Sequence, residues 1–137
     1  MTLVVVNGGK VAAAQQLKAW LNGLILRLYQ NNRTPAITNV AGDYLEATFT
    51  GYASQAIVSF GNAFLNTSSI AELDASPMTF TQTGTLVTNT IFGYYVTDVA
   101  GNLIYAELNP NGSFNMNQTG LQYTVQPIMT LANIGGT

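Results

Sequence analysis

The 137-residue chain contains neither cysteine nor histidine. Without cysteine there is no disulfide and no thiolate nucleophile, and without histidine there is no imidazole to act as a general base near neutral pH. No serine stands in a G-x-S-x-G elbow, and Gly8 and Gly9 belong to no phosphate-binding G-x-x-x-x-G-K-[ST] loop. The sequence therefore predicts a protein that is not an enzyme and that uses neither a cofactor nor a metal.

Charge is scarce as well. Charged residues make up 7% of the chain, against about 25% in an average globular protein. The four basic residues are too few to follow a phosphate backbone, so nucleic acid is not expected as a partner. The start, MTLVVVNGGK, lacks the basic region of a signal peptide, and no apolar run reaches the roughly 18 residues of a membrane span. We therefore expect a soluble protein without membrane contact.

Uncharged polar residues take the place of the missing charge. The chain is rich in Thr, Asn, Gln, Ser and Gly, and its formal net charge is only −2. Surfaces of this kind repel one another weakly, and a net charge near zero favours association. A subunit that lies against many neighbours is therefore favoured over an isolated monomer, and we expect a homo-oligomer, either a dimer or a trimer.

The six carboxylates are the remaining candidates for catalytic groups or metal ligands. A glycosidase needs two of them across a sugar-binding cleft, and calcium needs several hard oxygen ligands. The pairs in question are Asp43 with Glu46, Glu72 with Asp74, and Asp98 with Glu107 or Asn102. Because no calcium-loop motif is present, solvated turn residues are the favoured interpretation of these acids.

One segment has helical periodicity. Over residues 10–22, Ala14, Leu17 and Leu21 recur at helical spacing, with polar residues on the other side. Trp20 is expected to anchor this helix in the core. Asn7 or Gly8 is expected to begin the helix and Gly23 to end it in a left-handed conformation.

The rest of the chain has the two-residue period and the turn residues of β-structure. The alternation predicts a strand at 24–29 and a hairpin from 91–97 and 102–108 around Asp98–Gly101. Further strand character is expected at 48–53, 57–65, 79–85 and 121–131, with Pro127 at an edge or bulge, whereas 30–35 and 66–77 are expected to be irregular. These elements predict a mainly β fold, an antiparallel β-sandwich or partly closed barrel with one N-terminal α-helix. Residues 1–9 are expected to form an N-terminal arm or strand, and 10–137 a single β-rich domain.

Two groups of residues are candidates for contact with a partner. The first is the β-branched, uncharged N-terminal segment, which we expect to lie on a neighbour or to extend its sheet; its residues are Thr2, Leu3, Val4, Val5 and Val6. The second consists of Tyr52, Tyr94, Tyr95 and Tyr105. By parity, one face of the first hairpin strand packs a core, and the other forms a second surface. Exposed tyrosines with Asn and Asp would also suit a carbohydrate-binding module, which remains the second hypothesis.

Four pieces of the sequence, taken in order, resemble a group of small virion proteins of tailed bacteriophages. They are LRLYQNNRTP (26–35), DYLEATFTGYA (43–53), MTFTQTG (78–84) and IFGYYVTDVAGNLIYAEL (91–108). The resemblance implies a non-enzymatic subunit of a virus particle, assembled in the bacterial host cytoplasm and located in the virion. Its partners would be the major capsid protein or other virion subunits. A capsid decoration (cement) protein is favoured, and a neck, tail or adhesion component is the alternative.

Overall fold

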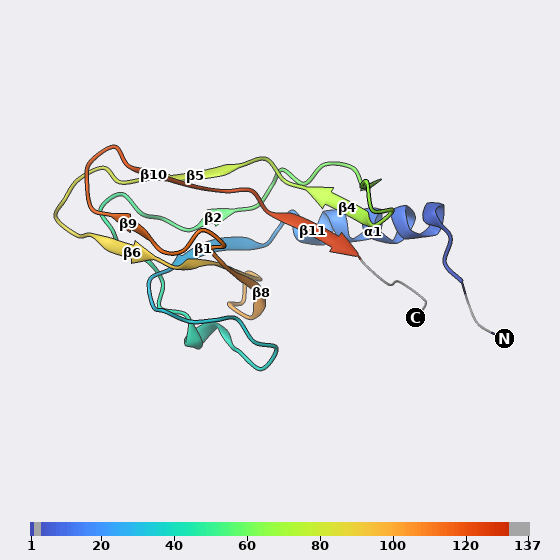
Figure 1. Ribbon diagram of the computed structural model, residues 1–137, viewed down its shortest axis with the longest axis horizontal. Helices are drawn as coiled ribbons and strands as arrows, with labels where there is room; N and C mark the ends of the chain where they lie inside the picture. Colours follow the sequence, from blue (N-terminus) through green and yellow to red (C-terminus); the bar gives the residue numbers. More distant parts are fainter. Residues whose placement is uncertain (2–3, 132–137) are drawn as a thin grey trace. The chain divides into compact units, whose positions relative to one another are not determined.

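Antiparallel β-sheets and one N-terminal α-helix make up the fold, which is described by a computed structural model covering residues 1 and 4–131 (Figure 1). The sheets pack as a sandwich, the first of the two predicted architectures. The chain divides into two compact units. We call them the helical unit (Met1–Gly23, Ile57–Pro77 and Gln126–Thr137) and the sandwich unit (Leu24–Ala56 and Met78–Val125).

In the part of the helical unit that the structure describes, α1 (Asn7–Leu21) accompanies a three-stranded antiparallel sheet. Strand β4 (Ala71–Asp74) lies in the middle, between β3 (Phe64–Leu65) and β11 (Ile128–Leu131). The apolar stripe of α1 packs on this sheet, with Ala14 and Leu21 completely buried. Among the described residues, no α-helix has both the length and the apolar character that a membrane span needs.

The N-terminal end of α1 agrees with the prediction and the C-terminal end differs from it. The helix begins at Asn7, one of the two residues expected to begin it, although its N-cap is Val6, which supplies no side-chain hydrogen bond. At the other end the C-cap is Asn22, with φ −78°, and Gly23 is not left-handed. Trp20 is 49% exposed rather than buried, because it lies about 100° around the helix from Leu21.

The sandwich unit contains three antiparallel sheets. The largest has the order β2-β1-β7-β8, and two pairs, β10-β5 and β6-β9, complete the unit. Its strands are β1 (Ile25–Tyr29), β2 (Gln55–Ala56), β5 (Met78–Thr81), β6 (Asn89–Ile91), β7 (Gly93–Thr97), β8 (Leu103–Leu108), β9 (Phe114–Met116) and β10 (Gln122–Val125). In Figure 1 the β5–β10 pair lies on one side of β1, and the loop over 30–47, drawn in teal, lies on the other.

The predicted hairpin is confirmed. Strands β7 and β8 pair in antiparallel register from Gly93↔Leu108 to Thr97↔Leu103, with a bulge near Val96. Gly101 has φ 89°, the left-handed conformation that the turn requires. The predicted strand at 24–29 and the loop at 30–35 are also confirmed.

Other strand predictions were wrong in extent. Residues 48–53 form a turn around Gly51 and no strand, and within 57–65 only Phe64–Leu65 is a strand. The predicted strand at 79–85 ends at Thr81. Conversely, 66–77 contains β4, whose Ala71 and Leu73 are completely buried. The predicted strand at 121–131 is interrupted at Pro127, which has no N–H for a ladder, and its halves β10 and β11 belong to different units.

Strand β7 is buried on both faces, which corrects the parity prediction. Each of its five residues is buried, so neither face forms a second surface. The face that carries Tyr94 continues the Leu26 and Leu28 face of β1, and the opposite face carries Tyr95 and is covered by the 30–47 loop. A strand with two covered faces shows no apolar–polar alternation, and for this reason sequence parity gave the wrong result.

Gly93 allows the side chain of Tyr29 to lie on β7. A Cβ built at Gly93 would lie 2.7 Å from the Tyr29 hydroxyl oxygen and closer still to the Glu107 carbonyl oxygen. Replacement by alanine therefore forces the backbone of β8 or the ring of Tyr29 to shift. Gly42 lies in the same unit, and a Cβ there would meet no atom within 4 Å.

We therefore predict that Gly93→Ala lowers the free energy of unfolding by about 2–3 kcal/mol, the usual cost of overpacking. Gly42→Ala is the matched control and should change it by less than about 0.5 kcal/mol. Urea unfolding followed by circular dichroism measures both variants. Equal stability of the two would show that β7 and Tyr29 are not in this close contact.

Candidate interaction surface

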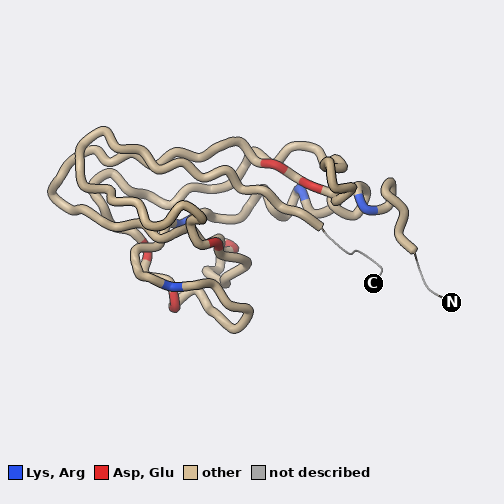
Figure 2. The backbone as a smooth tube through the Cα atoms, viewed as in Figure 1, with Lys and Arg blue, Asp and Glu red and all other residues tan. Residues whose placement is uncertain are grey.

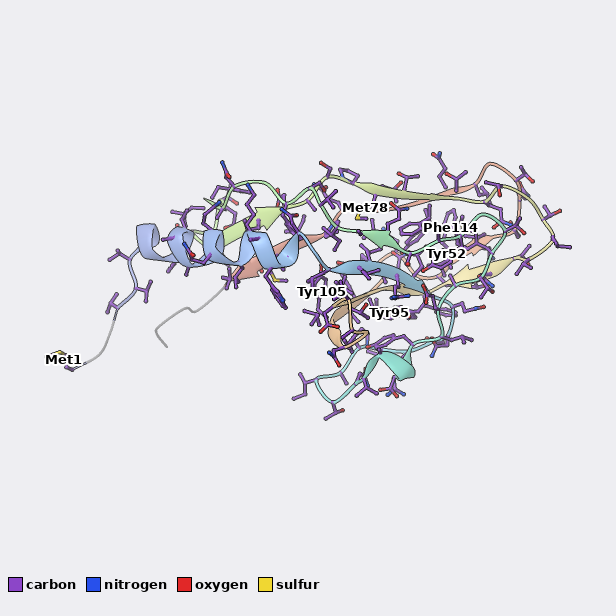
Figure 3. All side chains as sticks on the ribbon, turned by 180° about the vertical axis from the view of Figure 1, so that it is seen from behind. Met1, Tyr52, Met78, Tyr95, Tyr105 and Phe114 are labelled. Atoms are coloured by element: carbon purple, nitrogen blue, oxygen red, sulfur yellow. The ribbon has the colours of Figure 1, made fainter. Side chains whose placement is uncertain are left out.

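The four tyrosines predicted to contact a partner are largely internal. Tyr94 is 7% exposed and Tyr95 5%, while Tyr52 and Tyr105 are half-buried. Tyr52 stacks on Phe80 with ring centroids 5.8 Å apart. Tyr105 meets the ring of Tyr94 edge-on at 6.2 Å. Figure 3 shows Tyr52, Tyr95 and Tyr105 on the sandwich unit.

Three tyrosines form a cluster between the large sheet and the 30–47 loop. Tyr44 of the loop stacks on Tyr95 of β7 at 5.2 Å and meets Tyr29 of β1 edge-on at 5.0 Å. The Tyr29 hydroxyl donates to the carbonyl oxygen of Arg33, 3.1 Å away. Burial raises the pKa of Tyr29 and of Tyr95 to about 12, so both hydroxyls stay protonated at neutral pH. This tyrosine cluster fixes the loop against the sheet.

An ion pair adds a second attachment of the loop. Nη1 of Arg27 lies 2.9 Å and 3.1 Å from the two carboxylate oxygens of Glu46. The Tyr52 hydroxyl donates to Glu46 and accepts the N–H of Leu28. Burial, and then the hydrogen bond to Glu46, raises the pKa of Tyr52. The Glu46 carboxylate therefore serves to join the loop, β1 and the turn at 50–53.

Four of the other five carboxylates also have local partners. Asp43 pairs with Arg33 at 3.3 Å, Glu107 accepts the Tyr94 hydroxyl at 2.6 Å, and Glu72 accepts the side-chain amide of Asn66 at 2.7 Å. Asp98 accepts the backbone and side-chain N–H groups of Asn102. Within residues 1 and 4–131, no three acidic groups gather in a way that would hold a metal ion.

The N-terminal candidates lie partly outside the described residues, which exclude Thr2 and Leu3. Val4 is 75% exposed and Val6 69%, and Val6 has extended backbone angles. Val5 is half-buried. Uncharged β-branched side chains with most of their surface in water are suited to a contact with another chain.

Two strand pairs of the sandwich unit, β5–β10 and β6–β9, contain no charged residue. No charged residue lies between Asp74 and Asp98 or after Glu107, so β5, β6, β9 and β10 contain none. Figure 2 shows these strands without a red or blue segment. The outward side of β5 and β10 consists of Thr79, Thr81, Gln122 and Thr124, which we call the neutral face. Across it the hydroxyls of Thr79 and Thr124 are 2.9 Å apart.

A groove runs between the 30–47 loop and the outer strand β8. Its volume is about 390 Å³, and residues 103–106 form one wall while residues 35–37 with Asn39 and Tyr44 form the other. A second hollow of about 410 Å³ shares Asn39 and Leu103 and extends past Val40 to Gly101. We call the two together the β8 groove. None of the residues that line it is charged.

Sequence reasoning missed this loop as a surface. Ile37 is fully exposed, and Val40 and Leu45 are about 60% exposed (63% and 60%). The only sequence signal was the presence of apolar residues within a stretch of Asn, Thr and Pro. The position of the loop beside β8 depends on the tyrosine cluster, in which Tyr95 lies 51 residues after Tyr44 and 66 residues after Tyr29 in the chain.

Comparison with known proteins gives no relative. A scan against models of protein families found no match, and searches of curated proteins and of solved structures found none either. The neutral face, the β8 groove and the exposed N-terminal valines are therefore the features of the molecule that bear on its function.

Two aspartates make the stability of the folded chain change with pH in opposite directions. Burial, with a hydrogen bond and repulsion from Glu72, raises the pKa of Asp74, and among the described residues its Oδ1 has no hydrogen-bond partner. The hydrogen bonds from Asn102 lower the pKa of Asp98. A raised folded-state pKa favours the folded chain at acid pH, and this stability is lost as the pH rises through that pKa; a lowered pKa has the reverse effect.

We predict that Asp74→Asn raises the melting temperature at pH 7 and that the gain shrinks toward pH 4. Asp98→Asn is the matched control of opposite sign and should lower the melting temperature at pH 7, with a smaller loss below pH 4. Differential scanning calorimetry between pH 3 and pH 8 measures both. A loss of stability at pH 7 in Asp74→Asn would contradict the placement of its carboxylate.

Proposed function

We propose that the protein is a non-enzymatic structural subunit of a tailed-phage virion, most specifically a capsid decoration (cement) protein. It would bind the head through protein–protein contacts with the major capsid protein or other virion subunits. The observation that carries the proposal is the absence of charged residues from the strand pairs β5–β10 and β6–β9. The sequence resemblance to small phage virion proteins supplies the biological setting.

A decoration subunit is present in many copies on one particle. Charged copies at close spacing would repel one another, whereas a neutral surface of Thr and Gln can approach neighbours without that cost. Hydroxyl and amide groups still exchange hydrogen bonds with a partner, and they hold no charge that burial would leave unpaired. Modest contacts of this kind become strong when they are repeated over a shell.

The alternative is a neck, tail or adhesion component with a carbohydrate-binding β-sandwich. The observation that favours it is a polar hollow of about 320 Å³ lined by Thr88, Asn89, Thr90, Asn115 and Asn117. Amide and hydroxyl groups are suited to sugar hydroxyls. The tyrosines expected to stack on a sugar are, however, engaged in internal packing, which leaves this hollow without an aromatic wall.

Electron microscopy of intact virions tests the proposal. Gold-labelled antibody against this chain should decorate the head at many regularly spaced positions. Label confined to the neck or tail would favour the alternative, and absence from purified virions would overturn both. A glycan array distinguishes the alternative further, because binding that is lost in Asn117→Ala would establish the polar hollow as a sugar site.

We predict that lysines on the neutral face prevent attachment to capsids. A charge buried at the contact without a partner costs about 1–3 kcal/mol or more of binding free energy. The double variant Gln122→Lys with Thr124→Lys should therefore weaken binding to capsids by at least about tenfold. Leu86→Lys is the control, since Leu86 is 91% exposed in a loop. Co-sedimentation with capsids assembled without this subunit gives the measurement. Unchanged binding of the double variant would exclude the neutral face as the contact.

A further inference from the structure

Strand β8 has an unpaired edge. It is the outermost strand in the order β2-β1-β7-β8 and pairs only with β7 among the described residues. Alternate backbone N–H and C=O groups of such a strand point away from the sheet and can accept another strand. Natural proteins commonly protect such an edge with lysine or proline. Between Asp98 and Glu107 the chain has neither.

The β8 groove lies along this edge. Four consecutive residues of β8, 103–106, line it, so the strand contributes its edge as well as one of its faces. The opposite wall is the 30–47 loop, which the tyrosine cluster and the Arg27–Glu46 ion pair hold in place. A strand lying in the groove would therefore pair with β8 and place side chains against an uncharged wall.

The chain itself contains a segment with matching chemistry. Residues 2–6 read TLVVV, with three consecutive β-branched valines and no charge, the composition of a strand. Both faces of such a strand would carry apolar side chains. Either face can therefore lie against the uncharged groove. Val4 and Val6 are exposed and Val6 is already extended, so little of their own unit has to be rearranged.

We propose that the N-terminal segment Thr2–Val6 of one copy adds as a strand to the edge of β8 in a second copy, within the β8 groove. The inference deepens the proposed function, because it names a homotypic contact of the subunit, but its test requires no virus particle. The contact is heterologous, since the segment of one copy meets the groove of the next. Repetition closes a ring, such as a trimer, or continues as a filament.

Complementary variants provide the test. Ile104→Lys puts a charge on the edge and in the groove but leaves the N-terminal segment intact. Val4→Asp with Val6→Asp changes the segment and leaves the groove intact. Sedimentation velocity should show oligomers for the wild type and for the control Leu86→Lys, and monomers for each defective variant. A one-to-one mixture of the two defective variants should form a heterodimer and nothing larger, because it retains a single segment–groove contact.

Disulfide trapping gives a second readout, because a variant that is only misfolded would not form the specific disulfide between two chains. The chain has no cysteine, so Val5→Cys and Ile104→Cys each introduce the only thiol. A mixture of the two should form an intermolecular disulfide under mild oxidation, since paired strands bring Cα atoms within about 7 Å. The mixture of Val5→Cys with Leu86→Cys is the control and should form far less mixed disulfide.

Three outcomes would overturn the proposal. A wild type that stays monomeric at all concentrations has no such contact, although decoration of capsids could then still be observed. Oligomers that survive in both defective variants use another surface. A disulfide that forms within one chain of the double variant Val5→Cys/Ile104→Cys, without dimers, shows that the segment pairs with its own β8.

Discussion

Strand β1 is hydrogen-bonded along both edges, and the sandwich unit depends on this. One edge pairs with β7 over all five residues. The other edge pairs with β2 only at Ile25 and Leu26, after which the Tyr52 hydroxyl accepts the Leu28 N–H and Ala47 donates to the Leu28 carbonyl oxygen. The short strand β2 covers only the first part of this edge, and the Tyr52 side chain and the loop backbone supply the remaining hydrogen bonds. These bonds matter because a buried backbone group without a partner lowers the stability of the fold.

The same strand positions the candidate surface. Tyr29, at the end of β1, lies over Gly93 and holds Tyr44 and the Arg33 carbonyl, so the 30–47 loop stays beside β8. Arg27, two residues earlier, attaches the loop again through Glu46. The groove is therefore a consequence of core packing, and its walls do not need a ligand to keep them apart.

Local patterns predicted the elements whose signal is local. The stripe of Ala14, Leu17 and Leu21 and the turn ending at Gly101 depend on neighbouring residues, and both were found. Strand β4 was missed because the Ser, Glu and Asp content of 66–77 is typical of a loop, although Ala71 and Leu73 alternate with Glu72 and Asp74 and the strand pairs with β11. The burial of Tyr95 and the groove were missed because Tyr44, about fifty residues away, provides the covering ring. Contacts between distant segments leave little trace in a single sequence.

The neutral face and the free edge of β8 share one property, which is that few or no charged side chains lie on them. A protein that is soluble alone keeps its sheet edges apart with charged side chains. Here β5, β6, β9 and β10 have none, and β8 has only Glu107, whose carboxylate accepts the Tyr94 hydroxyl. A chain with these surfaces lacks the usual protection against association. Such a sequence is consistent with a molecule whose working state is assembled, in which neighbouring copies or a shell cover the surfaces that charge would otherwise protect.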